Sequence, residues 1–355
     1  MAAANIISVI GTGITLLSFL LDNVPSGDEQ TKLSYIIAND GANGDLSSAG
    51  GDLPDVRLWD ETAEFLGANY DDGYCGEGVT TCTTDVDTQE AATYTLFSGN
   101  NDAICIAWTG LSWAGGQKKY GFHPGNWAHA CDQTSFNNGY WYYAGTQVPG
   151  ISYEDDVFCA WVDKDGDIPT TGFQVHWPEF DGDNSQQQNL DYYCREQPPV
   201  WFHTESDPGS IFHWTQKRDL FARDPSIKMS PAANLRANGE RNQQQREEAK
   251  RAQGEHLAKR FEKDPRIIKS HWAKHLATEL CNPDGHAAGQ SFVSYEEKKF
   301  CHMPTKTVYS FCETTDEGVC WSDADNKVVV RDPTTARLPA PDMGHVSKII
   351  VWGPE

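Results

Sequence analysis

The segment AICIAWTGLSW, residues 103–113, decides the fold class because large and small side chains alternate along it. Ile104, Ile106 and Trp108 alternate with small neighbours, and a period of two residues is typical of a β-strand. The segment GFQVHWPEF, residues 172–180, starts with the same alternation. Both segments predict strands of one β-rich domain.

Five further segments are enriched in β-branched and aromatic residues, which favour strands. They are residues 32–40, 55–67, 93–99, 139–145 and 156–163. Turn sequences rich in Gly, Asn and Asp separate the segments. Short strands joined by such turns predict a mainly β protein, with an antiparallel β-sandwich of jelly-roll or lectin-like type and an inserted helical part.

The remaining patterns divide the 355 residues into four parts. We predict an uncharged hydrophobic N-terminal helix over residues 1–24 and an acidic β-sandwich over residues 25–200. A basic helical segment follows over residues 201–282, and a cysteine-bearing C-terminal region with late strands covers residues 283–355.

Two helices are predicted inside the basic segment. One is long and polar, from Ser230 to about residue 263, and the other is the amphipathic segment RIIKSHWAKHLATEL, residues 266–280. Two late strands are predicted at Lys327–Arg331 and Lys348–Trp352. Because the second ends almost at the last residue, we expect it to pair with an existing sheet.

Charge is unevenly distributed along the chain, which has 51 acidic and 28 basic side chains and a net charge of -23. Residues 1–215 hold 31 acidic and 6 basic side chains, whereas residues 216–275 hold 15 basic and 8 acidic ones. An acidic protein is not built to coat nucleic acid. The segregation favours contact between acidic and basic surfaces, within the fold or between copies, although a solvated helix with internal ion pairs explains the basic segment equally well.

The first 21 residues contain no charged side chain, and their apolar residues recur with helical spacing. The apolar stripe, which we take as a candidate assembly surface, comprises Ile6, Ile10, Ile14, Leu17 and Leu21. Such a helix fits packing between subunits, burial within its own fold, membrane contact or a cleaved signal.

Ten cysteines are present, and no C-x-x-C pair suggests zinc. An even number favours disulfide bonds and an oxidising environment, with buried free thiols as the alternative. The candidates are Cys75, Cys82, Cys105, Cys131, Cys159, Cys194, Cys281, Cys301, Cys312 and Cys320. The short loops make Cys75–Cys82 and Cys312–Cys320 natural local pairs.

Residues 121–145 mix aromatic side chains with Asn, Gln and His. Sugar-binding surfaces use this mixture, and so do protein interfaces, but ordinary core packing explains it equally well. Candidate ligand-binding residues are Trp127, Tyr140, Trp141 and Tyr143. Glycans are therefore candidate ligands.

Asp163, Asp165 and Asp167 alternate along DKDGD, which resembles the first half of a calcium-binding loop. The later ligands of that loop are missing, so an acidic hairpin turn is the favoured interpretation and a calcium site is the alternative. Ca²⁺ is thus the one candidate cofactor, and no motif requires a cofactor. His271 and His275 have a spacing that can hold zinc on a helix, but the metalloprotease signature is absent.

Four blocks of the sequence, residues 11–25, 100–110, 170–180 and 298–312, resemble cysteine-bearing proteins of filamentous ascomycete fungi. The resemblance implies a fungal source and a position outside the cell or at its surface. It supplies no catalytic residues.

No motif for nucleophilic, phosphoryl-transfer or dinucleotide chemistry occurs in the sequence. We therefore predict a non-enzymatic structural protein that associates with itself into oligomers or filaments. A lectin-like carbohydrate-binding protein is the first alternative, and a membrane-active toxin that inserts residues 1–21 is the second.

Overall fold

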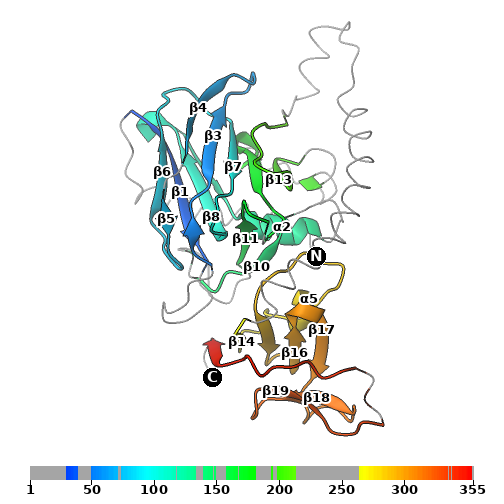
Figure 1. Ribbon diagram of the computed structural model, residues 1–355. Coiled ribbons are helices and arrows are strands. Elements are labelled where there is room, and N and C mark those ends of the chain that lie inside the picture. The colour runs from blue at the N-terminus through cyan, green and yellow to red at the C-terminus, as the bar shows by residue number, and fades with distance from the viewer. Residues whose placement is uncertain are drawn as a thin grey trace, which may run out of the picture.

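The computed structural model confirms a mainly β protein with several antiparallel sheets and few helices (Figure 1). It describes residues 29–38, 49–70, 73–116, 118–132, 139–146, 148, 157–166, 168–180, 193–194, 198–212, 264–334, 336 and 338–353. The predicted helices over residues 1–24 and 230–263 lie outside these ranges.

The first sheet has the strand order β10-β11-β8-β1-β6, and β9 also pairs with β8. Its strands are β1 (Thr31–Ile37), β6 (Cys82–Val86), β8 (Ile104–Ser112), β9 (Lys119–Phe122), β10 (Trp141–Tyr143) and β11 (Phe158–Val162). Every residue of β8 is buried, as expected for the strand that carries the deciding segment.

The second sheet has the order β13-β12-β7-β3-β4, and all its pairings are antiparallel. Its strands are β3 (Asp55–Trp59), β4 (Phe65–Asn69), β7 (Tyr94–Ser98), β12 (Gly172–His176) and β13 (Val200–His203). The two sheets share one core, in which Tyr35 of β1 meets Phe97 of β7 with ring centroids 6.0 Å apart.

The C-terminal sheet lies at one end of the first two sheets and has the order β17-β16-β15-β14-β20 (Figure 1). Its strands are β14 (Arg266–Ser270), β15 (Ser291–Ser294), β16 (Lys299–His302), β17 (Thr307–Ser310) and β20 (Lys348–Trp352). Strand β14 runs parallel to both β15 and β20, and the other pairs are antiparallel.

Four short strands form two ladders beside these sheets, and two short α-helices and three 3₁₀-helices are also described. The 3₁₀-helices are η1 (Ala114–Gly116), η2 (Trp177–Phe180) and η5 (Met303–Thr305). The strands are β2 (Gly51–Asp52), β5 (Tyr74–Cys75), β18 (Val319–Ser322) and β19 (Lys327–Val330), and the helices are α2 (Pro124–Asp132) and α5 (Ala277–Leu280). Each of the seven predicted β segments contains a strand, and both late strands are confirmed. The last strand, β20, pairs with β14 as expected.

The amphipathic helix predicted over residues 266–280 is wrong. Residues 266–270 form strand β14, and only residues 277–280 are helical. The consecutive residues Ile267 and Ile268 are both fully buried because they belong to two different hydrophobic clusters, one on each side of the strand. A strand buried on both faces lacks a two-residue pattern, so its sequence resembles a helix.

The segment after β13 crosses the outer face of the second sheet, and we call residues 204–212 the strap. The carbonyl oxygen of Pro208 accepts hydrogen bonds from Ser98 Oγ at 2.7 Å and from Arg57 Nη1 at 3.1 Å. The amide side chain of Gln174 pairs with the backbone N–H and C=O of Phe212. These bonds satisfy polar groups that the sheet would otherwise bury unpaired.

Candidate functional site

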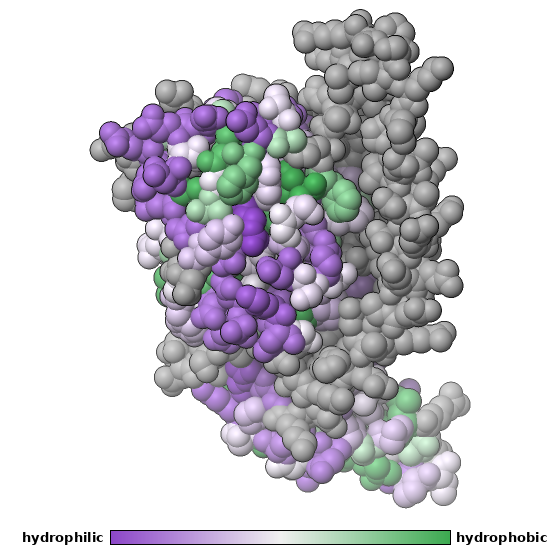
Figure 2. Space-filling view, turned by 45° about the horizontal axis from the view of Figure 1, so that its top comes forward, coloured by the Kyte–Doolittle hydropathy of each residue, from purple (hydrophilic) through white to green (hydrophobic). Residues whose placement is uncertain are grey.

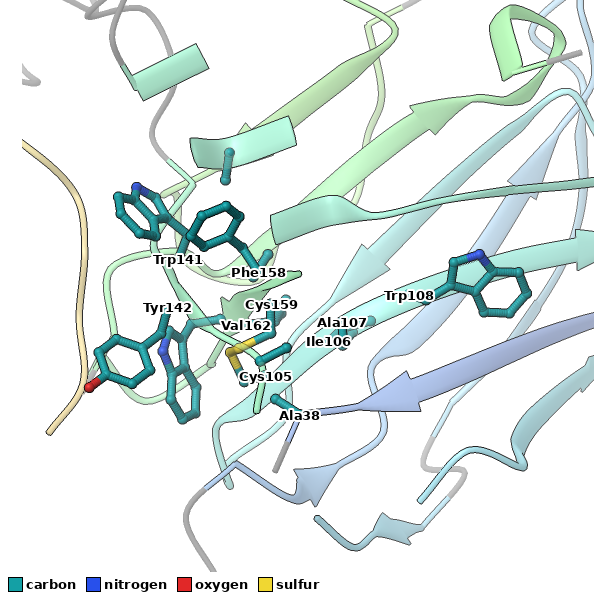
Figure 3. Packing of buried hydrophobic residues seen from close by; sticks show 14 of the residues in the cluster. Ala38, Cys105, Ile106, Ala107, Trp108, Trp141, Tyr142, Phe158, Cys159 and Val162 are labelled. Atoms are coloured by element: carbon teal, nitrogen blue, oxygen red, sulfur yellow. A yellow bond between two sulfur atoms is a disulfide. The ribbon is translucent and has the colours of Figure 1, made fainter. Parts of the chain in front are cut away.

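All ten cysteines form disulfide bonds, as the sequence predicts. The pairs are Cys75–Cys82, Cys105–Cys159, Cys131–Cys194, Cys281–Cys301 and Cys312–Cys320. Both predicted local pairs are confirmed. Figure 3 shows the bond between Cys105 of β8 and Cys159 of β11 inside the core. Five disulfides indicate that the protein folds in an oxidising environment.

The predicted ligand-binding aromatics are placed in the core. Trp127, Tyr140, Trp141 and Tyr143 are between 1% and 6% exposed. Trp141 packs edge-on against Phe158 with ring centroids 5.1 Å apart (Figure 3). These side chains therefore do not form the exposed platform on which a sugar ring would stack.

Three of these four aromatics follow helix α2, which brings polar groups to the C-terminal sheet. The helix begins at Pro124, a residue favoured in the first helical turn. A Cβ on Gly125 would lie 2.3 Å from the backbone of Phe158, so the helix packs directly on strand β11. This close contact fixes the direction in which the end of the helix points.

Asp132, the last residue of α2, binds His286 of the C-terminal part. Its carboxylate accepts hydrogen bonds from the His286 ring, from the His286 backbone N–H at 2.8 Å and from Trp141 Nε1 at 2.9 Å. Burial alone would raise the pKa of Asp132, but these hydrogen bonds hold it below its ordinary value. The carboxylate therefore remains ionised while it joins the two parts.

In a second carboxylate–histidine pair, the carboxylate comes from the C-terminal part and the histidine from α2. Glu279 of α5 lies 2.6 Å from His129 Nε2 of α2, and its other oxygen accepts a hydrogen bond from Tyr143 at 3.2 Å. The Tyr143 hydroxyl in turn accepts a hydrogen bond from the backbone N–H of Leu276 at 2.9 Å. Together the two pairs form a polar junction between α2 and the C-terminal sheet.

Lys306 stabilises the loop that carries His286. Its amine donates hydrogen bonds to the carbonyl oxygens of Leu280 at 2.8 Å and Ala287 at 2.6 Å. Burial lowers the pKa of Lys306 to about 7. Ala287 lies within the stretch closed by the Cys281–Cys301 disulfide, and Leu280 directly precedes that stretch, so an amine and a covalent bond hold the same loop.

The polar junction combines carboxylates, histidines and a tyrosine hydroxyl, which are also the groups of many catalytic sites. In the described ranges, a carboxylate binds one nitrogen of each ring, and neither His129 nor His286 has a hydrogen bond to a hydroxyl or thiol group. A Ser–His or Cys–His arrangement needs that contact. The observed hydrogen bonds connect α2 to the C-terminal part of the fold.

The predicted calcium loop brings two of its three carboxylates together. Asp163 is fully buried, and its Oδ2 accepts a hydrogen bond from the backbone N–H of Ile168 at 2.9 Å. Burial, reinforced by the neighbouring Asp165, raises the pKa of Asp163 to about 6. Asp167 lies outside the described residues. Within the described residues, no three His, Cys, Asp or Glu side chains gather as metal ligands.

We expect Asp163→Asn to raise the free energy of unfolding by about 1 to 2 kcal/mol above pH 6. The raised pKa means that the folded protein disfavours the carboxylate. The resulting loss of stability is absent below the ordinary pKa of 3.8 and complete above pH 6. Urea unfolding at pH 4 and pH 7.5 measures the effect, with Asp325→Asn as an exposed control. A destabilised variant, together with stabilisation of the unmodified protein by Ca²⁺, would show instead that the carboxylates bind calcium.

Exposed aromatic side chains occur in another region, where sequence reasoning placed no site. Phe65 is 53% exposed, Tyr70 55% and Tyr74 57%. Figure 2 shows hydrophobic side chains gathered between hydrophilic ones on one face of the molecule. We call Phe65, Tyr70 and Tyr74 the exposed aromatic strip.

The strip lies among carboxylates. Phe65 follows the turn Asp60–Glu64, whose sequence DETAE contains three of them. Tyr74 pairs with Asp52 in the β2–β5 ladder. Burial raises the pKa of the Tyr74 hydroxyl, and the negative charges of Asp102, Glu77 and Asp52 raise it further. The field at this surface therefore attracts cations.

The candidate assembly residues Ile6, Ile10, Ile14, Leu17 and Leu21 all lie outside the described residues. No helix in the described ranges has the length and hydropathy that a bilayer-spanning helix needs.

Comparisons with known proteins return no match, whether with protein-family models, with curated proteins or with solved structures.

Proposed function

We propose that this protein is a non-enzymatic interaction protein that associates with itself outside the cell or at its surface. The observation that carries the proposal is the segregation of charge, since 31 of the 51 acidic side chains lie in residues 1–215 and 15 of the 28 basic ones lie in residues 216–275. A copy with one acidic and one basic surface can bind a second copy head to tail. Such contacts generate rings or open filaments.

The five disulfides support the extracellular part of the proposal, because structural disulfides persist in secreted and surface proteins. The sandwich, for which a jelly-roll or lectin-like topology is our proposal, would supply the acidic surface.

We expect the full-length protein to form dimers or larger assemblies at about 20 mM salt and to dissociate at about 500 mM salt, because salt screens attraction between exposed charges. Light scattering on a sizing column measures the mass, and sedimentation velocity at three protein concentrations serves as the second readout. A protein that stays monomeric at about 100 μM and low salt contradicts the proposal.

Carbohydrate binding is the second candidate function, and the exposed aromatic strip favours it. Aromatic faces that are open to solvent can stack on the apolar faces of sugar rings. Glycan binding that is lost in Phe65→Ala and Tyr74→Ala would select this function over self-association.

A further inference from the structure

We infer that the Asp207–Pro208 peptide bond in the strap is a self-cleavage site, at which the Asp207 carboxylate attacks the carbonyl group of its own residue. The reaction converts the chain into two polypeptides, residues 1–207 and residues 208–355. The inference goes beyond the proposed self-association and does not depend on it. Its evidence is the backbone conformation of Asp207, the contacts that hold the chain on both sides of it, and the surroundings of its carboxylate.

Asp207 has a backbone conformation that is unfavourable before proline. Its φ is 48°, and among the residues that the structure describes it is the one non-glycine residue with a positive φ that precedes a proline. A following proline ring favours extended conformations of the preceding residue. A positive φ also crowds the Cβ against the carbonyl oxygen that follows it in the chain. The strain therefore lies beside the bond that the carboxylate attacks.

Side chains in or beside the second sheet hold the strap on both sides of this bond. On one side, the Thr171 hydroxyl donates a hydrogen bond to the carbonyl oxygen of Glu205 at 2.6 Å. On the other side, the carbonyl oxygen of the buried Pro208 accepts the two hydrogen bonds described above. Two residues lie between the anchored carbonyl groups, and Asp207 is one of them. A strained conformation persists where the surrounding structure imposes it in this way.

The carboxylate of Asp207 is available as a nucleophile. Its side chain is 60% exposed, and its Oδ1 lies 3.9 Å from Arg57 Nη2, which is beyond hydrogen-bonding distance. Among the described residues, no group donates a hydrogen bond to this carboxylate. Attack on the carbonyl carbon of the same residue closes a five-membered ring, and a reaction within one residue gains from proximity.

Two further Asp–Pro bonds lie in the described residues, and both lack this geometry. The Asp264 carboxylate is bound by Arg266, whose Nε lies 2.7 Å from Asp264 Oδ1. Asp332 Oδ1 accepts hydrogen bonds from the backbone N–H and the hydroxyl of Thr334 at 2.8 and 2.7 Å. Neither Asp264 nor Asp332 has a positive φ. These two bonds therefore serve as internal controls, because they share the chemistry of the Asp207–Pro208 bond and not its conformation.

The reaction has two steps, and water is its one co-reactant. In the first step, a carboxylate oxygen of Asp207 forms a bond to the Asp207 carbonyl carbon, and the C–N bond to Pro208 breaks. The electron pair of that bond passes to the Pro208 nitrogen, which takes a proton from solvent, while Asp207 becomes a cyclic anhydride. In the second step, water opens the anhydride and leaves two carboxyl groups on Asp207. Acid favours the first step because the leaving nitrogen must gain a proton.

The two products differ in charge and have no covalent link. Residues 1–207 hold 31 acidic and 6 basic side chains, whereas residues 208–355 hold 20 acidic and 22 basic ones. No disulfide joins a cysteine before Asp207 to one after it. The polar junction and the shared hydrophobic core keep the products associated in the folded protein. Cleavage therefore separates an acidic chain from a nearly neutral one without taking the fold apart.

The test incubates the folded full-length protein with protease inhibitors at pH 5 and at pH 7.5. Because no disulfide links the products, non-reducing denaturing gels and intact mass follow the fragments directly. We expect residues 1–207 and residues 208–355 to appear at least about tenfold faster than fragments from cleavage after Asp264 or Asp332. Cleavage should be faster at pH 5. In concentrated urea the three bonds should cleave at similar rates, because unfolding removes the geometry that distinguishes them.

Two variants identify the nucleophile. Asp207→Glu keeps the charge but requires a larger ring, so we expect it to slow cleavage after residue 207 about tenfold or more. Asp332→Glu is the matched control and should cleave after Asp207 like the unmodified protein, and circular dichroism checks that both variants fold at pH 5. Equal rates at the three bonds of the folded protein, or no cleavage after Asp207, overturn the inference. Cleavage that is unchanged in Asp207→Glu also overturns it, because the agent is then a protease that acts on the strap.

Discussion

Lowering the pH from 7 to 4 will reduce the free energy of unfolding by on the order of 5 kcal/mol. The cause is three buried histidines that the folded protein holds neutral. Burial lowers the pKa of His123 to about 4, of His275 to about 3 and, with a smaller contribution from the charge of His345, of His302 to about 4. In the unfolded chain each ring takes up a proton near pH 6.5. The stability that each neutral histidine contributes is therefore complete above pH 6.5, and it is lost as the pH falls toward the pKa of that histidine in the folded protein.

His275 shows why protonation is unfavourable. Its ring stacks on Tyr143 at 4.1 Å and meets Trp272, Phe292 and Trp352, while its Nδ1 lies 3.0 Å from Ser270 Oγ. None of these side chains is a carboxylate that would stabilise an imidazolium. Asp163 and Glu179 act in the opposite direction, since burial raises the pKa of each carboxyl group and thereby favours the folded protein at acidic pH, but these two groups do not offset the three histidines.

Urea unfolding at pH 7, 6, 5 and 4 measures the loss. His275→Gln should flatten part of the pH dependence, whereas His271→Gln, at a partly exposed position four residues earlier, should leave the curve unchanged. A stability that is constant between pH 7 and pH 4 would contradict the assignment of these histidines as neutral.

Asp132→Ala is the second substitution with a large expected effect, about 3 to 5 kcal/mol of destabilisation. It removes the acceptor for the His286 ring, for the His286 backbone N–H and for Trp141 Nε1, and it leaves all three donors buried without a partner. Asp132→Asn keeps one oxygen acceptor, so it should lose less stability.

Hydrogen exchange locates the effect of these substitutions. We expect faster exchange first in residues 276–306, which contact the polar junction, and only later in β1 and β8, which belong to the core of the first sheet. Uniformly faster exchange in all sheets would show that Asp132 supports the whole fold and not the junction in particular.

Local patterns determined how much of this structure could be predicted. The alternation along residues 103–113 marked the central strand β8, and the two short cysteine spacings marked two disulfides, because both signals are confined to neighbouring residues. The helix predicted over residues 266–280 failed for the opposite reason. Strand β14 forms there because β15 and β20, both distant in sequence, pair with it on its two edges.

The aromatic residues illustrate the same limit at the site. Tyr142 and its neighbours are buried by residues about 150 positions away, as the hydrogen bond from the Tyr142 hydroxyl to the Gln290 carbonyl shows. No local pattern reports such a contact. Conversely, Phe65 begins β4, Tyr70 directly follows β4 and Tyr74 begins β5, and only the folded structure shows that their side chains are exposed.

The disulfides have a consequence for how the molecule matures. Six cysteines pair within residues 75–194 and four within residues 281–320, and no bond joins the two groups. Ten thiols can pair in roughly a thousand ways, whereas six alone have about 15 and four alone about 3. As the ribosome releases the chain from its N-terminus, the first group can reach its native pairs before the second exists. Synthesis from the N-terminus thus separates the pairing of ten cysteines into the pairing of six cysteines followed by the pairing of four.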